Sequence, residues 1–286
     1  MENYGRGYAN TLENPATRFF EIKNGELQYY DKAQKEGPTK GIIPVKKPFT
    51  FLVLDILTCI KGFNEAENTG FYSNEVRDLK TETLIVRTKK GIEAKGLYAD
   101  IKDSLKVSGG KYGQSTYIAY KDESGQLVIG NIYFSGSSLA GGKTVDGKDV
   151  GGWMAFRNNY KSSLFKGAVT LLPETIECKK GKNIYNVPTF KLIEVAPETD
   201  VKAIALNKTL QEYLTSYFKK AHQEVVEQEV IAEQVAEAHK EVFNTTEDPF
   251  ADFVPDEVDN SAAAIFPPKE EKSTIFTGGE SDDLPF

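Results

Sequence analysis

Basic and aromatic residues are interspersed through the middle of the chain, and together they could hold a nucleic acid. Between Arg77 and Lys121 there are ten basic residues and five acidic ones. Cations neutralise phosphates and flat rings stack under bases, so a surface for single strands needs both. The predicted contact residues are Phe71, Tyr72, Arg77, Arg87, Lys89, Lys90, Lys95, Lys111, Tyr112, Tyr117, Tyr120, Tyr133, Lys143, Trp153 and Arg157. Because an aromatic residue on a strand fills a core more often than it binds a base, we expect only some of these rings to bind.

The last five residues form a second group with chemistry of its own: Asp282, Asp283, Leu284, Pro285 and Phe286. Phe286 carries a ring and a free carboxylate on one residue, and Pro285 restricts the backbone beside it. An apolar pocket rimmed by Arg or Lys would recognise all these features, which is the known mode of C-terminal carboxylate capture. The alternative is an ordinary acidic tail that only aids solubility.

This ending resembles that of the single-stranded-DNA-binding proteins of bacteria and their phages, whose acidic tails finish in Asp-Asp-Ile/Leu-Pro-Phe. The resemblance covers residues 282–286 one by one and the rest only in general plan, so the body is similar to a divergent, phage-encoded version. It implies an OB-fold that coats single-stranded DNA in replication, recombination and repair. It also implies that the tip recruits replication and recombination proteins, in the cytoplasm of a bacterial host.

Residue inventory argues against catalysis. The two histidines, His222 and His239, lie on a long acidic helical segment, so the body has none for a triad or a His-containing metal site. The run Gly141–Thr144 lacks the first glycine of a phosphate-binding loop, because Ser137 stands there. We therefore predict no catalytic residue, no metal and no cofactor, and a mobile loop whose Lys143 and Lys148 touch a DNA backbone.

Charge is divided unevenly along the chain. Residues 222–286 hold three of the 35 basic and 17 of the 42 acidic residues, a net of −14, which leaves residues 1–221 with a net of +7. A basic body with an acidic tail points to nucleic acid, and it suggests that the tail competes for the body. Two distant cysteines, no signal peptide and no run of 18 apolar residues favour a cytosolic protein without membrane contact.

Apolar periodicity predicts a mainly β body that places the basic and aromatic residues. The Asn24-Gly25 turn joins strands 18–23 and 26–30 into a hairpin. Next come a long bent strand (45–63), strands 70–76 and 83–88, a helix over 93–107 and a hairpin of strands 115–121 and 126–134. This is the element order of the OB-fold, a five-stranded Greek-key barrel with a helix that caps its open end.

The second half of the chain extends this barrel. A Gly/Ser/Lys-rich loop is predicted at 135–152, a short helix at 153–164 and further strands at 168–172, 175–179 and 184–194. Asn207 is the predicted cap of a helix from 208 to about 242, whose second half fits a protruding or oligomer-forming helix. The predicted parts are an elaborated OB-fold domain (1–206), a long helix (207–243) and a disordered acidic tail (244–286).

Two other functions stay open at this point. The chain could be an acidic adaptor or assembly protein whose barrel binds protein instead of DNA. It could also be a recombination protein that binds single strands and anneals them. Phosphate contacts make affinity fall steeply with salt, so the salt dependence of binding distinguishes a DNA-binding protein from the adaptor. A complementary-strand annealing assay identifies the recombination protein.

Overall fold

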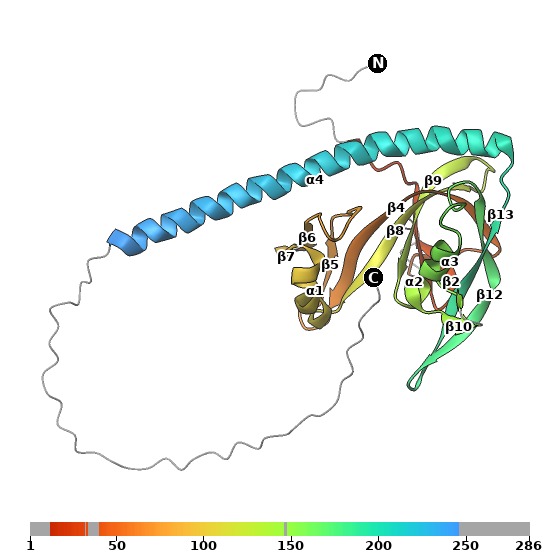
Figure 1. The fold of residues 1–286 in the computed structure, drawn as a ribbon, viewed down its shortest axis with the longest axis horizontal. Helices are drawn as coiled ribbons and strands as arrows, with labels where there is room; N and C mark the ends of the chain where they lie inside the picture. Colours follow the sequence, from red (N-terminus) through yellow and green to blue (C-terminus); the bar gives the residue numbers. More distant parts are fainter. Residues whose placement is uncertain (1–11, 32, 34–39, 146–147, 246–286) are drawn as a thin grey trace, which may run out of the picture. The chain divides into compact units, whose positions relative to one another are not determined.

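The computed structural model describes residues 12–31, 33, 40–145 and 148–245, and this part of the chain is mainly β (Figure 1). Its elements are β1 (Arg18–Lys23), β2 (Glu26–Tyr30), β3 (Ile42–Pro44), β4 (Phe49–Asn64), β5 (Thr69–Ser73), β6 (Leu84–Thr88), β7 (Gly91–Gly96), α1 (Tyr98–Val107), β8 (Gly110–Lys121), β9 (Leu127–Ser135), α2 (Ser137–Ala140), β10 (Lys143–Val145), β11 (Lys148–Val150), α3 (Trp153–Asn159), β12 (Ala168–Lys180), β13 (Asn183–Ile193) and α4 (Pro197–Thr245).

The chain divides into two compact units, residues 1–233 and 234–286, and the sheets lie in the first. Of the second unit the structure describes the last residues of α4. Of the predicted tail, residues 244 and 245 belong to α4, and residues 246–286 with the tip at 282–286 lie outside the described residues. No helix in the described ranges is both long enough and apolar enough to cross a membrane.

One mixed sheet holds eleven of the strands found in the described residues. Its main path runs β3-β2-β1-β9-β8-β4-β5-β6-β7, while β12 pairs with β4 and β13 with β12. β1 and β9 are parallel and the other pairs are antiparallel. The predicted first hairpin is confirmed: Asn24 and Gly25 have φ of 48° and 79°, the left-handed pair that a type I′ turn requires.

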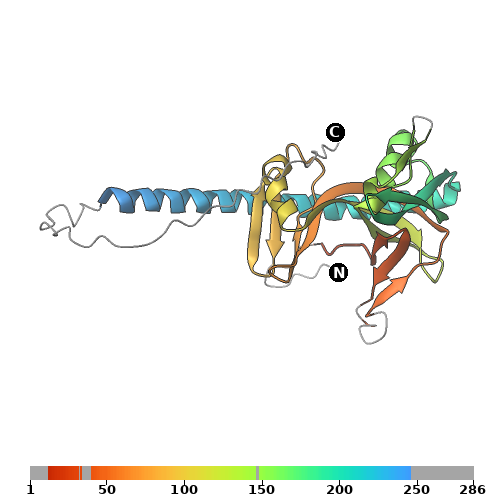
Figure 2. The same ribbon diagram turned by 90° about the horizontal axis from the view of Figure 1, so that it is seen from below.

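β4 connects the two ends of this sheet. It pairs with β8 from Phe51 to Gly62, with β12 near its start and with β5 near its end. Both views show it running from the strands around β12 to the β5–β7 strands (Figures 1 and 2). A bulge between Val53 and Asp55 shifts the alternation by one residue, so Asp55 lies on the same face as Leu52.

The two faces of the sheet carry different cores. We call the inner face the side with Phe51, Ile118 and Phe134, where Trp153 of α3 is buried. The inner face continues under α1, where Ile60 and Leu84 are buried together with Leu105. We call the opposite side the α4 face; there Leu57 and Tyr117 pack against Leu210 and Leu214 of α4.

Two helix starts were wrongly predicted. Residues 91–96 form strand β7 instead of the start of a helix, because they pair with β6. Gly96 has φ of 153°, a positive value that favours glycine and that no residue of a right-handed helix adopts. α4 begins at Pro197 rather than at Lys208, since proline suits the first helical position and Glu198 and Asp200 favour the positive helix end. Asn207 lies inside α4, so the boundary expected after residue 206 falls within a helix.

Other boundaries changed less. The predicted loop at 135–152 contains α2 and the β10–β11 hairpin, and the short helix predicted to reach residue 164 ends at Asn159. The strands predicted at 168–172 and 175–179 are one strand, β12, with an irregularity between Leu171 and Thr175.

The mainly β class is confirmed. β4, β5, β6, α1, β8 and β9 follow the predicted order, with β7 added. A closed barrel of these strands would need β6 to meet β9. Within the described residues β6 pairs with β5 and β7, and β9 pairs with β8 and β1.

The contact of α4 with the sheet can be measured. Leu214 is fully buried between α4 and the sheet, so Leu214→Ala should lower the free energy of unfolding by about 2–5 kcal/mol through lost packing and the cavity left behind. Val201, on the same helix but 67% exposed, gives the control, and Val201→Ala should change stability little. Urea unfolding measures both; equal losses would show that α4 does not hold the sheet as described.

Candidate nucleic-acid interface

Strand pairing brings three cations and one exposed ring into a row on the α4 face. Lys111 of β8 pairs with Lys61 of β4, Lys61 pairs with Tyr72 of β5, and Tyr72 pairs with Arg87 of β6. Directly paired residues project from the same face of a sheet, and neighbouring strands lie about 5 Å apart. The row therefore crosses four adjacent strands and presents positive charge beside an aromatic ring.

Tyr133 of β9 extends the row. It pairs with Ser115, and its ring lies over Gly113, where a Cβ would collide with it. The ammonium of Lys61 sits 4.2 Å from the centre of the ring, a cation–π contact, and the Tyr133 hydroxyl donates to the carbonyl of Lys111 at 3.4 Å. Burial raises the pKa of this hydroxyl above its usual range, so the ring stays neutral.

Phe63 completes the set. It lies two residues after Lys61 on the same face and pairs with Gly70, which has no side chain to cover it. Its side chain is 52% exposed and that of Tyr72 is 57% exposed. The ladder is the name we give to these six residues: Lys61, Phe63, Tyr72, Arg87, Lys111 and Tyr133.

Sequence reasoning missed Lys61 and Phe63. Their signal was the alternation Cys59, Lys61, Phe63 around Ile60 and Gly62, near the end of the long strand. Because Ile60 is buried on the inner face, alternation puts Lys61 and Phe63 on the other face. The signal was readable, but only after the face of Ile60 was known.

Further predicted cations lie near the ladder. Lys95 pairs with Ile85, two residues before Arg87, and so shares the face of Arg87. Arg87 also donates to the carbonyl of Ile85 at 3.4 Å. Lys89 and Lys90 are exposed between β6 and β7, and Lys90 lies 3.1 Å from Glu67. An exposed pair of this kind is weak, so Lys90 can exchange Glu67 for another anion.

Four predicted stacking rings are core residues instead. Phe71 alternates with Tyr72 and so points to the inner face, where it packs with Leu84. Tyr120 packs edge-on against Phe20, at 5.1 Å between centroids. Trp153 is fully buried and stacks on Phe134 at 4.6 Å.

The fourth ring, Tyr117, lies under α4. Its hydroxyl donates to Glu75 at 3.0 Å, and only 1% of the residue is exposed. None of the four offers a face to a base. The prediction failed because strand alternation does not tell which face is exposed.

The prediction of Arg77 as a DNA contact was also wrong, because Arg77 holds α4 against the sheet. Its two terminal nitrogens donate to both oxygens of the nearly buried Asp55, at 3.0 and 2.8 Å, and Gln211 of α4 bonds to the same pair. The guanidinium lies 5.2 Å from the ring centre of Phe218. A bidentate pair in this setting is structural, because a phosphate would have to displace a buried carboxylate.

The remaining predicted residues lie away from the ladder. Tyr112 follows Lys111 but points to the inner face, where its ring lies 6.0 Å from that of Tyr98. Arg157 of α3 reaches the same face. Lys143 is exposed at the start of the small β10–β11 hairpin, which forms its own sheet. The structure thus groups Tyr72, Arg87, Lys111 and Tyr133 directly, with Lys89, Lys90 and Lys95 nearby.

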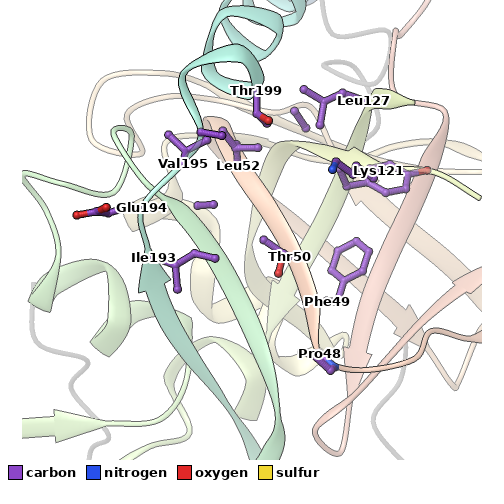
Figure 3. Close-up of a pocket in the computed structure, with 14 residues that line it drawn as sticks. Pro48, Phe49, Thr50, Leu52, Lys121, Leu127, Ile193, Glu194, Val195 and Thr199 are labelled. Carbon is purple, nitrogen blue, oxygen red and sulfur yellow. The ribbon is translucent and has the colours of Figure 1, made fainter. Parts of the chain in front are cut away.

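An apolar pocket of about 420 Å³ lies where β4 begins (Figure 3). Phe49, Leu52 and Leu127 line it, with Lys121 at one side and the first turn of α4 at Thr199. The pocket is far along β4 from Lys61, so it is separate from the ladder. In the described part of the chain no three His, Cys, Asp or Glu residues come together as a metal site.

Comparison with known proteins supplies no identity. The chain matches no protein family, and no similar curated protein or solved structure was found.

The carboxyl group under α4 should make stability depend on pH. Burial raises the pKa of Glu75 above its ordinary 4.5, with Ser115 and Tyr117 opposing, so the folded protein binds this proton more tightly than the unfolded chain does. The contribution of this group to stability is then greatest below pH 4.5 and is lost as the pH rises through the folded-state pKa. Glu75→Gln should flatten this decline and raise stability at neutral pH.

Urea unfolding at a series of pH values tests this, with the exposed Glu65→Gln as the control for loss of one charge. Parallel curves for wild type and Glu75→Gln would show that Glu75 is not the group responsible.

Proposed function

We propose that the chain binds single-stranded DNA through the ladder, without sequence preference and without catalysing a reaction. The observation that carries this proposal is the row of paired residues Lys111, Lys61, Tyr72 and Arg87, which places three cations and one exposed ring on four adjacent strands. Cations on phosphates and rings under bases are what a sequence-tolerant single-strand surface needs. Every base has a flat face, so rings such as Tyr72 and Phe63 accept all of them.

A barrel-like arrangement of the central strands would also support DNA binding. We propose that β4, β5, β6, α1, β8 and β9 form an elaborated OB-type barrel, with β1 taking the edge of β9 in place of direct closure. In OB-folds the faces of the second and third strands bind oligonucleotides. By order these strands are β5 and β6, and they carry Tyr72 and Arg87.

We infer from residues 282–286 that the nucleic acid is DNA and that the processes are replication, recombination and repair. Asp282 to Phe286 resembles the ends of bacterial and phage single-stranded-DNA-binding proteins, and we propose that it recruits partner proteins of those pathways in the cytoplasm of a bacterial host. The tail, residues 244–286 with 11 acidic and two basic residues, would also compete with DNA for the basic body at low salt.

Removing the tail tests the charge competition. In fluorescence anisotropy with labelled oligothymidylate, wild type should bind with an affinity that falls log-linearly with salt. A chain shortened to residues 1–245 should bind more tightly at low salt, with a smaller gain at high salt, because screening weakens the tail's attraction. Absence of binding by both forms would refute the DNA proposal and favour a protein-binding adaptor.

Substitutions in the ladder test the site itself. Tyr72→Ala should cost about 1–3 kcal/mol of binding free energy through the loss of one stacked base. Lys61→Gln should lower the slope of log affinity against log salt by about 0.7, the value for one phosphate on a single strand.

Matched controls lie outside the ladder. Phe165 is as exposed as Tyr72, and Lys166 is exposed beside it. Phe165→Ala and Lys166→Gln should leave both affinity and slope unchanged. If the control variants weaken binding as much as the ladder variants do, the ladder is not the site.

A further inference from the structure

Arg157 is a half-buried cation without a carboxylate partner among the described residues. It lies in the last turn of α3, and its Nη1 donates to the side-chain oxygen of Gln114 at 2.7 Å. Gln114 is itself only 6% exposed, and its amide donates to the hydroxyl of Tyr112 at 3.3 Å. The ion pairs of the described residues include Arg18 with Glu123 and Arg77 with Asp55, and none involves Arg157.

Partial burial of a guanidinium without an anionic partner costs free energy, and a bound anion would offset this cost. Burial lowers the pKa of Arg157 below its usual range, and the neighbouring Tyr112 only partly opposes this effect. A guanidinium has five N–H donors in a planar fork, which suits the oxygens of a phosphate. Gln114 holds one side of the fork in place. The geometry thus prepares Arg157 for an oxyanion that the described residues do not supply.

The position of Arg157 relates it to the ladder. Lys111 and Tyr112 are successive residues of β8, so the first projects from the α4 face and the second from the inner face. Gln114, which holds Arg157, is two residues further along, about 7 Å by the strand rise. Lys111 on one face and the contacts of Arg157 on the other are therefore separated by little more than the thickness of one sheet.

The end of the sheet at this point is open. β8 begins at Gly110, and β9 ends at Ser135 and is followed by the exposed Gly136. A Cβ built on Gly136 would have no atom within 4 Å, so no described side chain fills that space. The space at Gly136 is therefore available to a flexible nucleic-acid strand that leaves the ladder at Lys111 and Tyr133 and turns round this end.

We propose that a bound single strand continues from the ladder round the end of β8 and β9, and that Arg157 binds one of its backbone phosphates on the inner face. This inference rests on the proposed function and adds a second subsite to it. The rings of Tyr112 and Tyr98, both half-buried, lie beside the path and offer a stacking surface for a base. The ligand of Arg157 is a phosphodiester.

Oligonucleotide length is the measurement that separates the two subsites. Anisotropy with oligothymidylates of about 4 to 16 nucleotides covers the site sizes known for single barrels. Arg157→Gln should bind the shortest oligomers as wild type does, because these occupy only the ladder. On longer oligomers it should bind about tenfold more weakly, with a salt slope lower by about 0.7.

Two controls keep the result interpretable. Arg157→Lys should restore the salt slope but only part of the affinity, because ammonium keeps the charge and loses the fork. Thermal unfolding of each variant shows whether α3 is still folded, and hydrogen exchange of α3 should slow with long oligomers and not with short ones.

Several outcomes would overturn the inference. Identical length profiles for wild type and Arg157→Gln, or an equal loss at every length, would do so. A third outcome combines two measurements: inorganic phosphate alone stabilises wild type but not Arg157→Gln, and the two proteins bind oligomers of every length equally. Arg157 would then bind a free anion and not a phosphate of the nucleic-acid backbone. If Tyr72→Ala weakens binding and Arg157→Gln does not, only this inference fails; if wild type binds no oligomer, the proposed function fails first.

Discussion

The main sheet and its cores depend on the antiparallel pairing of β4 with β8. These two strands form the centre of the sheet, and both faces of the pair are used: Phe51 and Ile118 contribute to the inner core, while Leu57 and Tyr117 receive α4. The bulge at Leu54 keeps the apolar side chains of β4 on the correct faces along its whole length. Without this shift Lys61 would point to the inner face, and the ladder would not exist.

Much of this arrangement could be predicted from local signals, and the failures have physical reasons. The Asn24-Gly25 turn fixed the first hairpin because its backbone geometry is encoded in two residues. The start of α1 was missed because the apolar residues around Ala94 fit a helix as well as a strand, and pairing with β6 decides between them. The face of each ring was not predictable, since alternation is symmetric until one residue, such as Ile60, is known to be buried.

The charged residues show the same dependence on tertiary context. Arg77 and Arg157 look alike in the sequence, as isolated arginines near aromatic residues. In the structure Arg77 is neutralised by Asp55 and fixes α4, whereas Arg157 is held by the neutral Gln114 and keeps its charge for an anion. Asp55 is 22 residues from Arg77 in the sequence, and Gln114 is 43 residues from Arg157. Partners at such distances produce no recognisable local sequence pattern.

The burial of Trp153 has an optical consequence. It is the chain's one tryptophan, it is fully buried, and it stacks on Phe134 within the inner core. Its intrinsic emission therefore reports on α3 and the core and not on Lys61 or Tyr72. Quenching by a base needs ring contact, so a strand held only at the ladder leaves this emission unchanged, while a rearrangement of α3 alters it.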